Sequence, residues 1–329
     1  MKRILCLLAL TLLMSVTGCA KTPVDSPDDF YYAADLKKRI PGDFPLVTRI
    51  PGMAEGHCLP NPNDSTDADS VNAAYAGLFA VGDLKTVFQK LPTEKMYPAS
   101  MTKMMTALVV LESGVDLSEQ VPITADAFAD LTSDASIAYL HEGCTYSVSD
   151  LLVGLLIPSG NDAGNALAIH VSGSIPAFVQ KMNEKAKELG MFNTHYDNPH
   201  GLHTKNHYTT VYDMYLLAEA CAKQDLFLQI SAMKTAEVIC HNPDGSVTGQ
   251  SYTATNSFVR GFVKTPAGVT FLGGKTGYTK EAGRCLTVIA RGESGNLYVA
   301  VVGKVNGYEA LYTEMSNLLK KIPEYENGR

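Results

Sequence analysis

Patterns typical of β-strands lie near both ends of the folded part of this chain, and helical spacing fills its middle. The expected strands are residues 75–81, 87–88 with their neighbours, 269–274, 284–290 and 297–302. The expected helices are residues 99–113, 151–157, 163–171, 175–189, 212–221 and 308–319. Strands at both ends with helices between them suggest one sheet to which both chain ends contribute. Hairpins between successive strands make this sheet largely antiparallel. The sequence predicts an α+β fold with an inserted helical subdomain and a cleft between the two parts.

Three short polar motifs occur in order along this pattern. They are Ser100-Met101-Thr102-Lys103, Ser159-Gly160-Asn161 and Lys275-Thr276-Gly277. Each motif alone is common, and a second Ser-x-x-Lys occurs at Ser231–Lys234. Only the first copy is followed by a Ser-x-Asn and then by a Lys-Thr-Gly. The order therefore selects Ser100 over Ser231.

Ser100 lies at the first turn of an expected helix, directly after Pro98-Ala99. Free backbone N–H groups and the helix dipole favour negative charge there. Lys103 lies three residues later on the same face and can reach the Ser100 hydroxyl. A lysine can activate a serine only when burial and a nearby cation, such as Lys275, lower its pKa. The alternative is a helix-capping serine with a solvated lysine.

The second motif follows Pro158 in a turn between two expected helices. From this turn Ser159 can relay a proton to a leaving amine, and Asn161 can orient Lys103 and a substrate amide. A plain turn is the alternative interpretation.

The third motif ends an expected strand that contains Gly273-Gly274. These glycines permit another backbone, such as that of a substrate, to approach closely. Lys275 and Thr276 suit a carboxylate, and the backbone amides of Tyr278 and Ser100 are candidates for an oxyanion hole. A simple strand end is the alternative.

Together, the three motifs resemble those of the penicillin-recognising serine enzymes: D,D-peptidases, penicillin-binding proteins and serine β-lactamases. Three longer segments are similar to the low-molecular-mass D-alanyl-D-alanine carboxypeptidases. They are Pro98-Ala99-Ser100-Met101-Thr102-Lys103, Asn198-Pro199-His200-Gly201-Leu202 and Gly274-Lys275-Thr276-Gly277-Tyr278-Thr279. The resemblance covers about residues 70–320 and implies a β-lactamase/transpeptidase-like fold.

The resemblance also implies a role for each motif residue. Ser100 is expected to be the acylated nucleophile and Lys103 its base. The proton relay is expected to be completed by Ser159, Asn161 and Lys275. Substrate binding is expected from Lys275, Thr276, Gly277 and Tyr278, with no metal and no cofactor. The implied ligands are the D-Ala-D-Ala ends of peptidoglycan stem peptides, with β-lactams as inhibitors. We interpret His200 and Arg284 as structural rather than catalytic.

The N-terminus predicts export. Lys2 and Arg3 precede an apolar run over residues 4–16 that is too short to cross a bilayer as a helix. Val16-Thr17-Gly18-Cys19 resembles a bacterial lipoprotein signal, in which Cys19 becomes the lipidated first residue. An ordinary secretory signal is the alternative. We expect a protein anchored by lipid to the outer face of the cell membrane, or a periplasmic one.

This interpretation divides the chain into four parts. Residues 1–18 are the expected signal peptide, 19–69 a lipid-anchored tether and N-terminal extension, 70–322 the D,D-peptidase catalytic domain, and 323–329 a C-terminal tail. Many of the similar carboxypeptidases have a C-terminal amphipathic membrane anchor, and we expect the lipid on Cys19 to replace it.

Charge and cysteine content limit the partners. The net charge of −7 and the lack of a basic run argue against nucleic acid. Besides Cys6 and Cys19, five cysteines remain, so an exported monomer keeps at least one unpaired thiol. The spacing of these cysteines leaves their pairing open and suggests no metal site.

Three alternatives share parts of the motif set. A D,D-endopeptidase acting on cross-links uses the same residues. A class A-like β-lactamase needs a Glu-x-x-Leu-Asn sequence, which none of the glutamates between the second and third motifs begins. A non-catalytic β-lactam sensor normally adjoins a transmembrane signalling segment, and no stretch of this sequence has that character.

Overall fold

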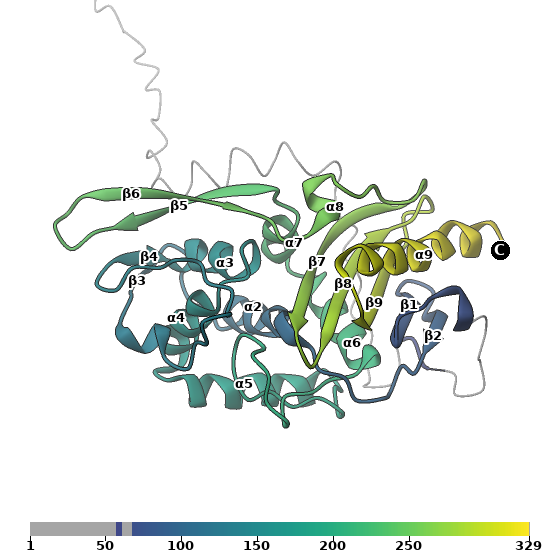
Figure 1. Cartoon of the computed structure of the whole chain (residues 1–329), viewed down its shortest axis with the longest axis horizontal. Coiled ribbons are helices and arrows are strands. Elements are labelled where there is room, and N and C mark those ends of the chain that lie inside the picture. The colour runs from purple at the N-terminus through teal and green to yellow at the C-terminus, as the bar shows by residue number, and fades with distance from the viewer. Residues whose placement is uncertain (1–56, 61–67, 329) are drawn as a thin grey trace, which may run out of the picture. The chain divides into compact units, whose positions relative to one another are not determined.

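The computed structural model describes residues 57–60 and 68–328 of the chain (Figure 1). The predicted signal peptide, Cys19 and most of the predicted tether lie outside these residues.

A five-stranded antiparallel sheet with the order β2-β1-β9-β8-β7 forms the centre of the fold. Its strands are β1 (Tyr75–Ala80), β2 (Lys85–Lys90), β7 (Thr270–Thr279), β8 (Gly283–Arg291) and β9 (Leu297–Val305). Because β1 pairs with β9, the two ends of the described chain meet inside one sheet. The prediction of a sheet built from both chain ends is confirmed.

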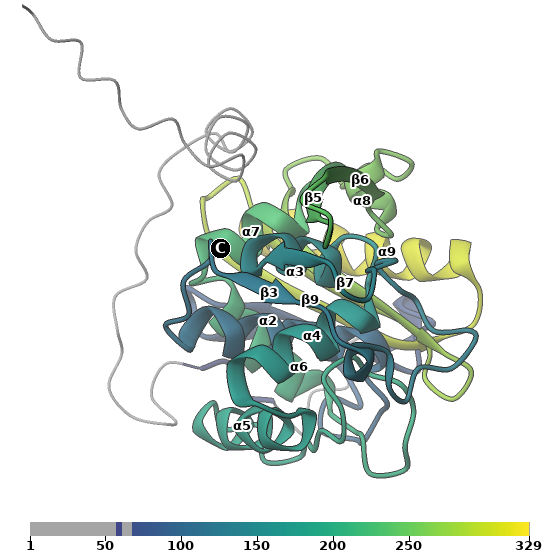
Figure 2. The ribbon, with the colours of Figure 1, turned by 90° about the vertical axis from the view of Figure 1, so that its left-hand side faces the viewer.

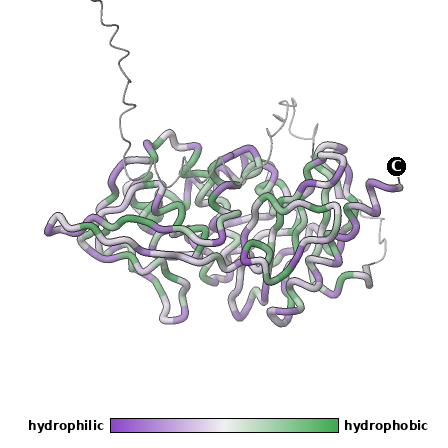
Figure 3. Tube along the Cα trace, turned by 90° about the horizontal axis from the view of Figure 1, so that it is seen from above, coloured by the Kyte–Doolittle hydropathy of each residue, from purple (hydrophilic) through white to green (hydrophobic). Residues whose placement is uncertain are grey.

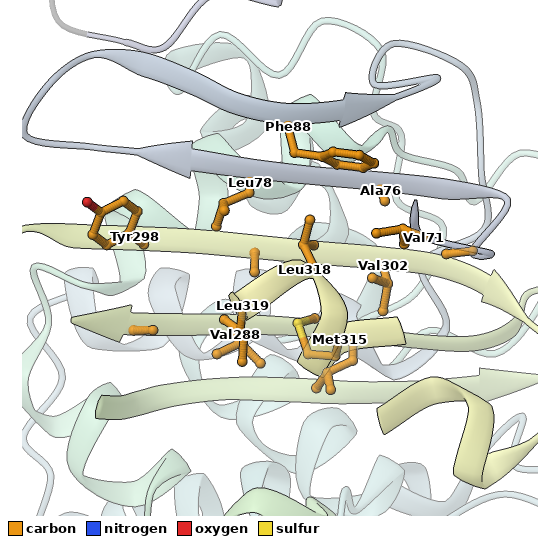
Figure 4. Close-up of a cluster of buried hydrophobic side chains, with 14 of the residues drawn as sticks. Val71, Ala76, Leu78, Phe88, Val288, Tyr298, Val302, Met315, Leu318 and Leu319 are labelled. Atoms are coloured by element: carbon orange, nitrogen blue, oxygen red, sulfur yellow. The ribbon is translucent and has the colours of Figure 1, made fainter. Parts of the chain in front are cut away.

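Alternation along β1 directs its side chains to two different layers. Ala76 and Leu78 belong to the core beneath α9 (Tyr308–Asn327), which Figure 4 shows in close-up. On the opposite face, Phe79 stacks on Tyr215 of α6 (Val211–Cys221) with ring centroids 4.4 Å apart. The sheet is thus covered by helices on both faces.

The predicted helical subdomain is present between β2 and β7 (Figure 2). Its helices and 3₁₀ turns, apart from α6, are η2 (Ala99–Thr102), α2 (Lys103–Glu112), η3 (Ala125–Phe128), α3 (Val148–Leu156), α4 (Asn161–Ser172), α5 (Ile175–Glu188), α7 (Asp225–Ser231) and α8 (Ser257–Arg260). A further 3₁₀ turn, η1 (Ala68–Ser70), precedes β1. Side-chain caps begin several of these helices: the Ser147 hydroxyl accepts from Asp150 N before α3, and Thr210 accepts from Asp213 N before α6.

A second sheet was not predicted. Its order is β3-β4-β5-β6, with β3 (Gln120–Pro122), β4 (Thr145–Ser147), β5 (Thr235–His241) and β6 (Val247–Thr253). Two of these strands have three residues, and the β5–β6 hairpin is largely exposed, so neither forms an apolar run in the sequence. Figure 3 shows the polar tip of this hairpin, residues 242–246, in purple.

Two further observations concern the length of the helices. Helix α9 continues to Asn327, so the boundary placed after residue 322 falls inside a helix. Within residues 57–60 and 68–328, no helix is both long and apolar enough to cross a membrane.

Candidate active site

Ser100 lies in η2, the 3₁₀ turn that leads into α2. The preceding Ala99 has φ 47°, an unusual conformation for a residue with a side chain. A loop holds it there: a Cβ on Gly201 would collide with the Ala99 carbonyl oxygen. Only glycine permits this contact, so the loop at Gly201 packs directly against the backbone that presents Ser100.

Lys103 begins α2 and is fully buried, with its amine at the centre of three contacts. Its Nζ lies 2.9 Å from Ser100 Oγ, 2.6 Å from Asn161 Oδ1 and 2.8 Å from the His200 carbonyl oxygen. The two carbonyl groups can accept both N–H bonds of a neutral amine. The lone pair of that amine is then free to accept the Ser100 proton.

The environment of Lys103 favours this neutral form. Burial, and then the charge of Lys275, lower the pKa of Lys103 well below its usual range, while Asp162 opposes the shift. A buried lysine beside a second cation is therefore able to act as a base near neutral pH.

The second motif forms the turn between α3 and α4. Ser159 adopts φ 68°, again a strained conformation for a non-glycine residue, and Asn161 begins α4. A Cβ on Gly160 would lie 2.6 Å from the Ala138 Cβ. The glycine thus allows the segment around residue 138 to press on the turn that carries Ser159 and Asn161.

The third motif lies in β7, an edge strand of the main sheet. Lys275 is buried and its Nζ donates to Ser159 Oγ at 3.0 Å and to the Thr276 carbonyl at 3.1 Å. Burial lowers the pKa of Lys275 to about 7. A Cβ on Gly277 would lie 3.1 Å from Ser100 N, so β7 passes directly beside the amide of the candidate nucleophile.

The strand extends further than predicted. β7 continues five residues beyond Gly274, to Thr279, because it pairs with β8 along its whole length apart from a bulge near Gly273. The third motif is therefore inside the strand rather than at its end. Tyr278 is 59% exposed on this edge, and the Arg284 guanidinium lies 4.6 Å from its ring centroid.

The structure thus brings together all three motifs selected from the sequence. The second Ser-x-x-Lys is different: Ser231 is buried at the end of α7, where its hydroxyl donates to Leu228 O and accepts from Gly274 N. Lys234 is exposed to solvent. The Ser231 hydroxyl is a structural group that supports β7.

Sequence reasoning missed two contributors to the site. The His200 carbonyl is a direct partner of Lys103, a role that no side-chain motif reveals. Thr255 Oγ1 lies 2.8 Å from Thr276 Oγ1, so a second hydroxyl group accompanies the one that the third motif supplies. The His200 imidazole is neutral: burial, and then Lys103, hold its pKa well below the ordinary value.

Metal-ligand geometry is not found in the described residues, which contain no group of three or more His, Cys, Asp or Glu side chains suited to an ion. The five described cysteines are all buried free thiols: Cys58, Cys144, Cys221, Cys240 and Cys285. The hydrogen bonds of Ser100 Oγ and Lys103 Nζ go to other groups, so these thiols are not part of the activated site.

A serine hydroxyl held against a buried lysine amine at the start of a helix, with a second serine–lysine pair beside it, is the arrangement that an activated-serine enzyme requires. The family model for D-alanyl-D-alanine carboxypeptidases of peptidase family S11 matches residues 64–306. The chain belongs to this family.

Individual relatives agree with this assignment. D-alanyl-D-alanine carboxypeptidase DacF of Bacillus subtilis is 35% identical over 222 residues, which cover 66% of this chain and 53% of the relative. A D-alanyl-D-alanine endopeptidase of Pseudomonas aeruginosa is 34% identical and covers 62% of each chain. The crystal structure of the Streptomyces K15 DD-transpeptidase superposes with a TM-score of 0.70 at 28% identity, covering 79% of this chain and 98% of that one. This chain spans about half the length of the first curated relatives it matches.

Proposed function

We propose that this protein is a serine D-alanyl-D-alanine carboxypeptidase that removes the terminal D-Ala of peptidoglycan stem peptides. The observation that carries the proposal is the 2.9 Å approach of the Lys103 amine to the Ser100 hydroxyl, with both remaining amine contacts going to carbonyl oxygens. Family membership supplies the substrate class.

Acylation follows from this geometry. Ser100 Oγ attacks the carbonyl carbon of the penultimate D-Ala while its proton passes to Lys103. The oxyanion forms beside the Ser100 amide, next to which β7 places Gly277. The backbone amide of Tyr278, the following residue in β7, is the candidate for the second donor. Backbone donors in such a position are often the largest single contribution to catalysis. As the amide C–N bond breaks, the leaving D-Ala nitrogen takes up the proton from Lys103 through Ser159, which Lys275 contacts at 3.0 Å.

Deacylation completes the cycle. A water molecule attacks the carbonyl carbon of the Ser100 ester while Lys103 takes one of its protons. The ester bond to Ser100 Oγ then breaks, Lys103 passes this proton to Oγ, and the shortened peptide leaves with a new carboxylate. A β-lactam presents a reactive amide to the same serine, and its acyl-enzyme persists because the ring remnant stays attached. We therefore expect β-lactams to be inhibitors.

Substrate recognition uses the edge of β7. A peptide laid along this strand as an added strand pairs with its free backbone groups. The terminal carboxylate is then bound by Lys275 and by the hydroxyls of Thr276 and Thr255.

A D,D-endopeptidase is the second candidate, because one relative with 34% identity has that name. An endopeptidase cleaves the bond between a D-Ala and the side-chain amine of a neighbouring stem peptide. Where that amine belongs to a diamino acid with a free carboxylate beside it, Lys275 and the Thr255–Thr276 hydroxyl pair suit this leaving group as well. The two candidates are therefore separated by their substrates in the activity test.

The N-terminal sequence supports a location outside the cytoplasm with a lipid on Cys19. The test is expression of the full chain and of Cys19→Ser in a bacterial host fed radiolabelled palmitate. Label that disappears in the variant supports the anchor. A variant that still takes up palmitate, or a full chain that takes up none, contradicts it.

The activity test uses the chain from residue 20 with a diacetylated Lys-D-Ala-D-Ala peptide and a cross-linked muropeptide dimer. Release of free D-alanine from the peptide, absent in Ser100→Ala, is the expected result. Cleavage of the dimer without release of D-alanine would transfer the assignment to the endopeptidase. If neither substrate is cleaved, the carboxypeptidase proposal is wrong.

A further inference from the structure

Asp162 is a buried carboxylate next to the second motif, and it is not among the motif residues. It lies in the first turn of α4, directly after Asn161, and its side chain has no exposed surface. An unpaired charge there is costly, so its partners indicate what the residue does.

Those partners are backbone amides, two of them from a different segment. Asp162 Oδ1 accepts from Ala138 N at 2.7 Å and from Ala163 N of its own helix at 2.9 Å. Its Oδ2 accepts from Leu140 N at 3.1 Å. Both oxygens thus bind the segment over residues 136–140, which we name the strap.

The strap in turn contacts the catalytic turn. Asn161 N donates to the Ser136 carbonyl at 2.8 Å, and Gly160 leaves room for Ala138 where any side chain would collide. From its other side, the strap is held by Tyr252 OH and Gln250 Nε2 of β6, which donate to the Ala138 carbonyl at 2.7 Å and 2.8 Å. The second sheet is therefore linked to the catalytic turn through the strap.

Tyr139 shows how firmly the strap is held. It lies between the two amides bound by Asp162, adopts φ 55° and is 66% exposed. A residue with a bulky side chain takes this conformation only when its surroundings impose it. The two hydrogen bonds to Asp162 are the local constraint that imposes it.

We propose that Asp162 is a positioning residue for catalysis, which fixes the strap against the Ser159–Asn161 turn and thereby holds the Asn161 side chain on Lys103. The inference rests on the proposed function. Because Asn161 Oδ1 is one of the two carbonyl oxygens that orient the Lys103 amine, a displaced turn misdirects the base. Asp162 also places a negative charge near that amine.

The test uses Asp162→Asn, which keeps the shape of the side chain but leaves a single oxygen to accept hydrogen bonds. The reaction measured is acylation by a fluorescent penicillin as a function of pH, in the chain from residue 20. We expect the acylation rate to fall at least about tenfold. We also expect its acidic limb to move to lower pH, because loss of the negative charge lets Lys103 lose its proton more readily. The other ionisable groups near Lys103 are Lys275, His200 and His207, and all stay unchanged.

Asp213→Asn is the matched control. Asp213 is similarly buried in the first turn of α6. Its Oδ2 accepts from Asn193 N at 3.0 Å and from Thr194 Oγ1 at 2.6 Å, so its carboxylate fastens a different loop. This variant should lose thermal stability without moving the pH profile. An equal acylation loss in both variants, or an unmoved limb in Asp162→Asn, overturns the proposal.

Tyr252→Phe tests the strap if Asp162→Asn does not fold. It removes one bond to the Ala138 carbonyl and leaves the charge of Asp162 in place, so acylation should slow about threefold with the limb unchanged. A wild-type acylation rate in Tyr252→Phe contradicts the role of the strap. Failure of the proposed function is separate: in that case the wild-type protein releases no D-alanine from the peptide, whatever the acylation rates of the variants.

Discussion

Lys103 and Lys275 lie in one buried site, and each contacts a different serine. The Lys103 amine is 2.9 Å from Ser100 Oγ, and the Lys275 amine is 3.0 Å from Ser159 Oγ. Two buried amines cannot both carry a proton without mutual repulsion, and the charge of Lys275 lowers the pKa of Lys103. The arrangement separates a base for the nucleophile from a cation that can serve the leaving group and the substrate carboxylate.

The two Ser-x-x-Lys sequences give the first prediction. Ser100→Ala should abolish acylation by a fluorescent penicillin and lower the release of D-alanine by at least about a thousandfold, because the nucleophile itself is removed. Ser231→Ala is the control, because the Ser231 hydroxyl supports β7 and is not the expected nucleophile. Peptide mapping of the labelled protein checks the site. An adduct on Ser231 would contradict the assignment.

Burial of Lys275 predicts how stability depends on pH. Its pKa is about 7 in the folded protein and near 10.5 in the unfolded chain, so the unfolded state binds more protons between these values and stability rises with pH. Relative to Lys275→Met, the wild-type protein should gain about 2 kcal/mol in its free energy of unfolding from pH 7 to pH 9.

Urea denaturation at the two pH values measures this difference. Lys234→Met, which removes an exposed lysine, serves as the control and should follow the wild-type protein at both pH values. A constant difference between wild type and Lys275→Met would mean that Lys275 keeps its proton in the folded state.

The contact between Gly277 and the nucleophile predicts a rate effect. Gly277→Ala places a methyl group 2.8 Å from the Pro98 carbonyl oxygen and 3.1 Å from Ser100 N, where the oxyanion is expected. Acylation should slow about a hundredfold, as for the loss of an oxyanion donor. Gly249→Ala in β6 adds a methyl group with no atom within 4 Å and should acylate normally. Stopped-flow fluorescence measures the acylation rates of both variants. Equal rates in the two variants would place the oxyanion elsewhere.

Thr255 provides a test of carboxylate recognition. Thr255→Val keeps the shape of the side chain but removes the hydroxyl that pairs with Thr276. For a peptide ending in a free carboxylate, KM should rise about tenfold, in line with the loss of one hydrogen bond to a charged group. Thr255→Ser should restore the wild-type value. With the terminal carboxylate converted to an amide, wild type and Thr255→Val should be cleaved at the same low rate, and a tenfold difference there would exclude carboxylate contact.

The predicted fold was confirmed where local sequence determines structure. Apolar residues form a run along β1 and recur at helical spacing after Ala99. Such patterns predict the elements correctly because each element buries its apolar residues. The strands of the second sheet were missed, since β3 and β4 have only three residues each and the β5–β6 hairpin is largely exposed, so none of them forms an apolar run in the sequence.

The sequence by itself determined which residues are the candidates for the chemistry, because Ser100, Ser159 and Lys275 belong to motifs whose order can be read along the chain. Only the tertiary structure decided how they are activated. The carbonyl oxygen of His200, the hydroxyl of Thr255 and the carboxylate of Asp162 act from segments distant in sequence from their partners. The pKa of Lys103 likewise depends on burial and on Lys275, which lies 172 positions further along the chain. Desolvation and charge act through space, so they exist only once the chain has folded.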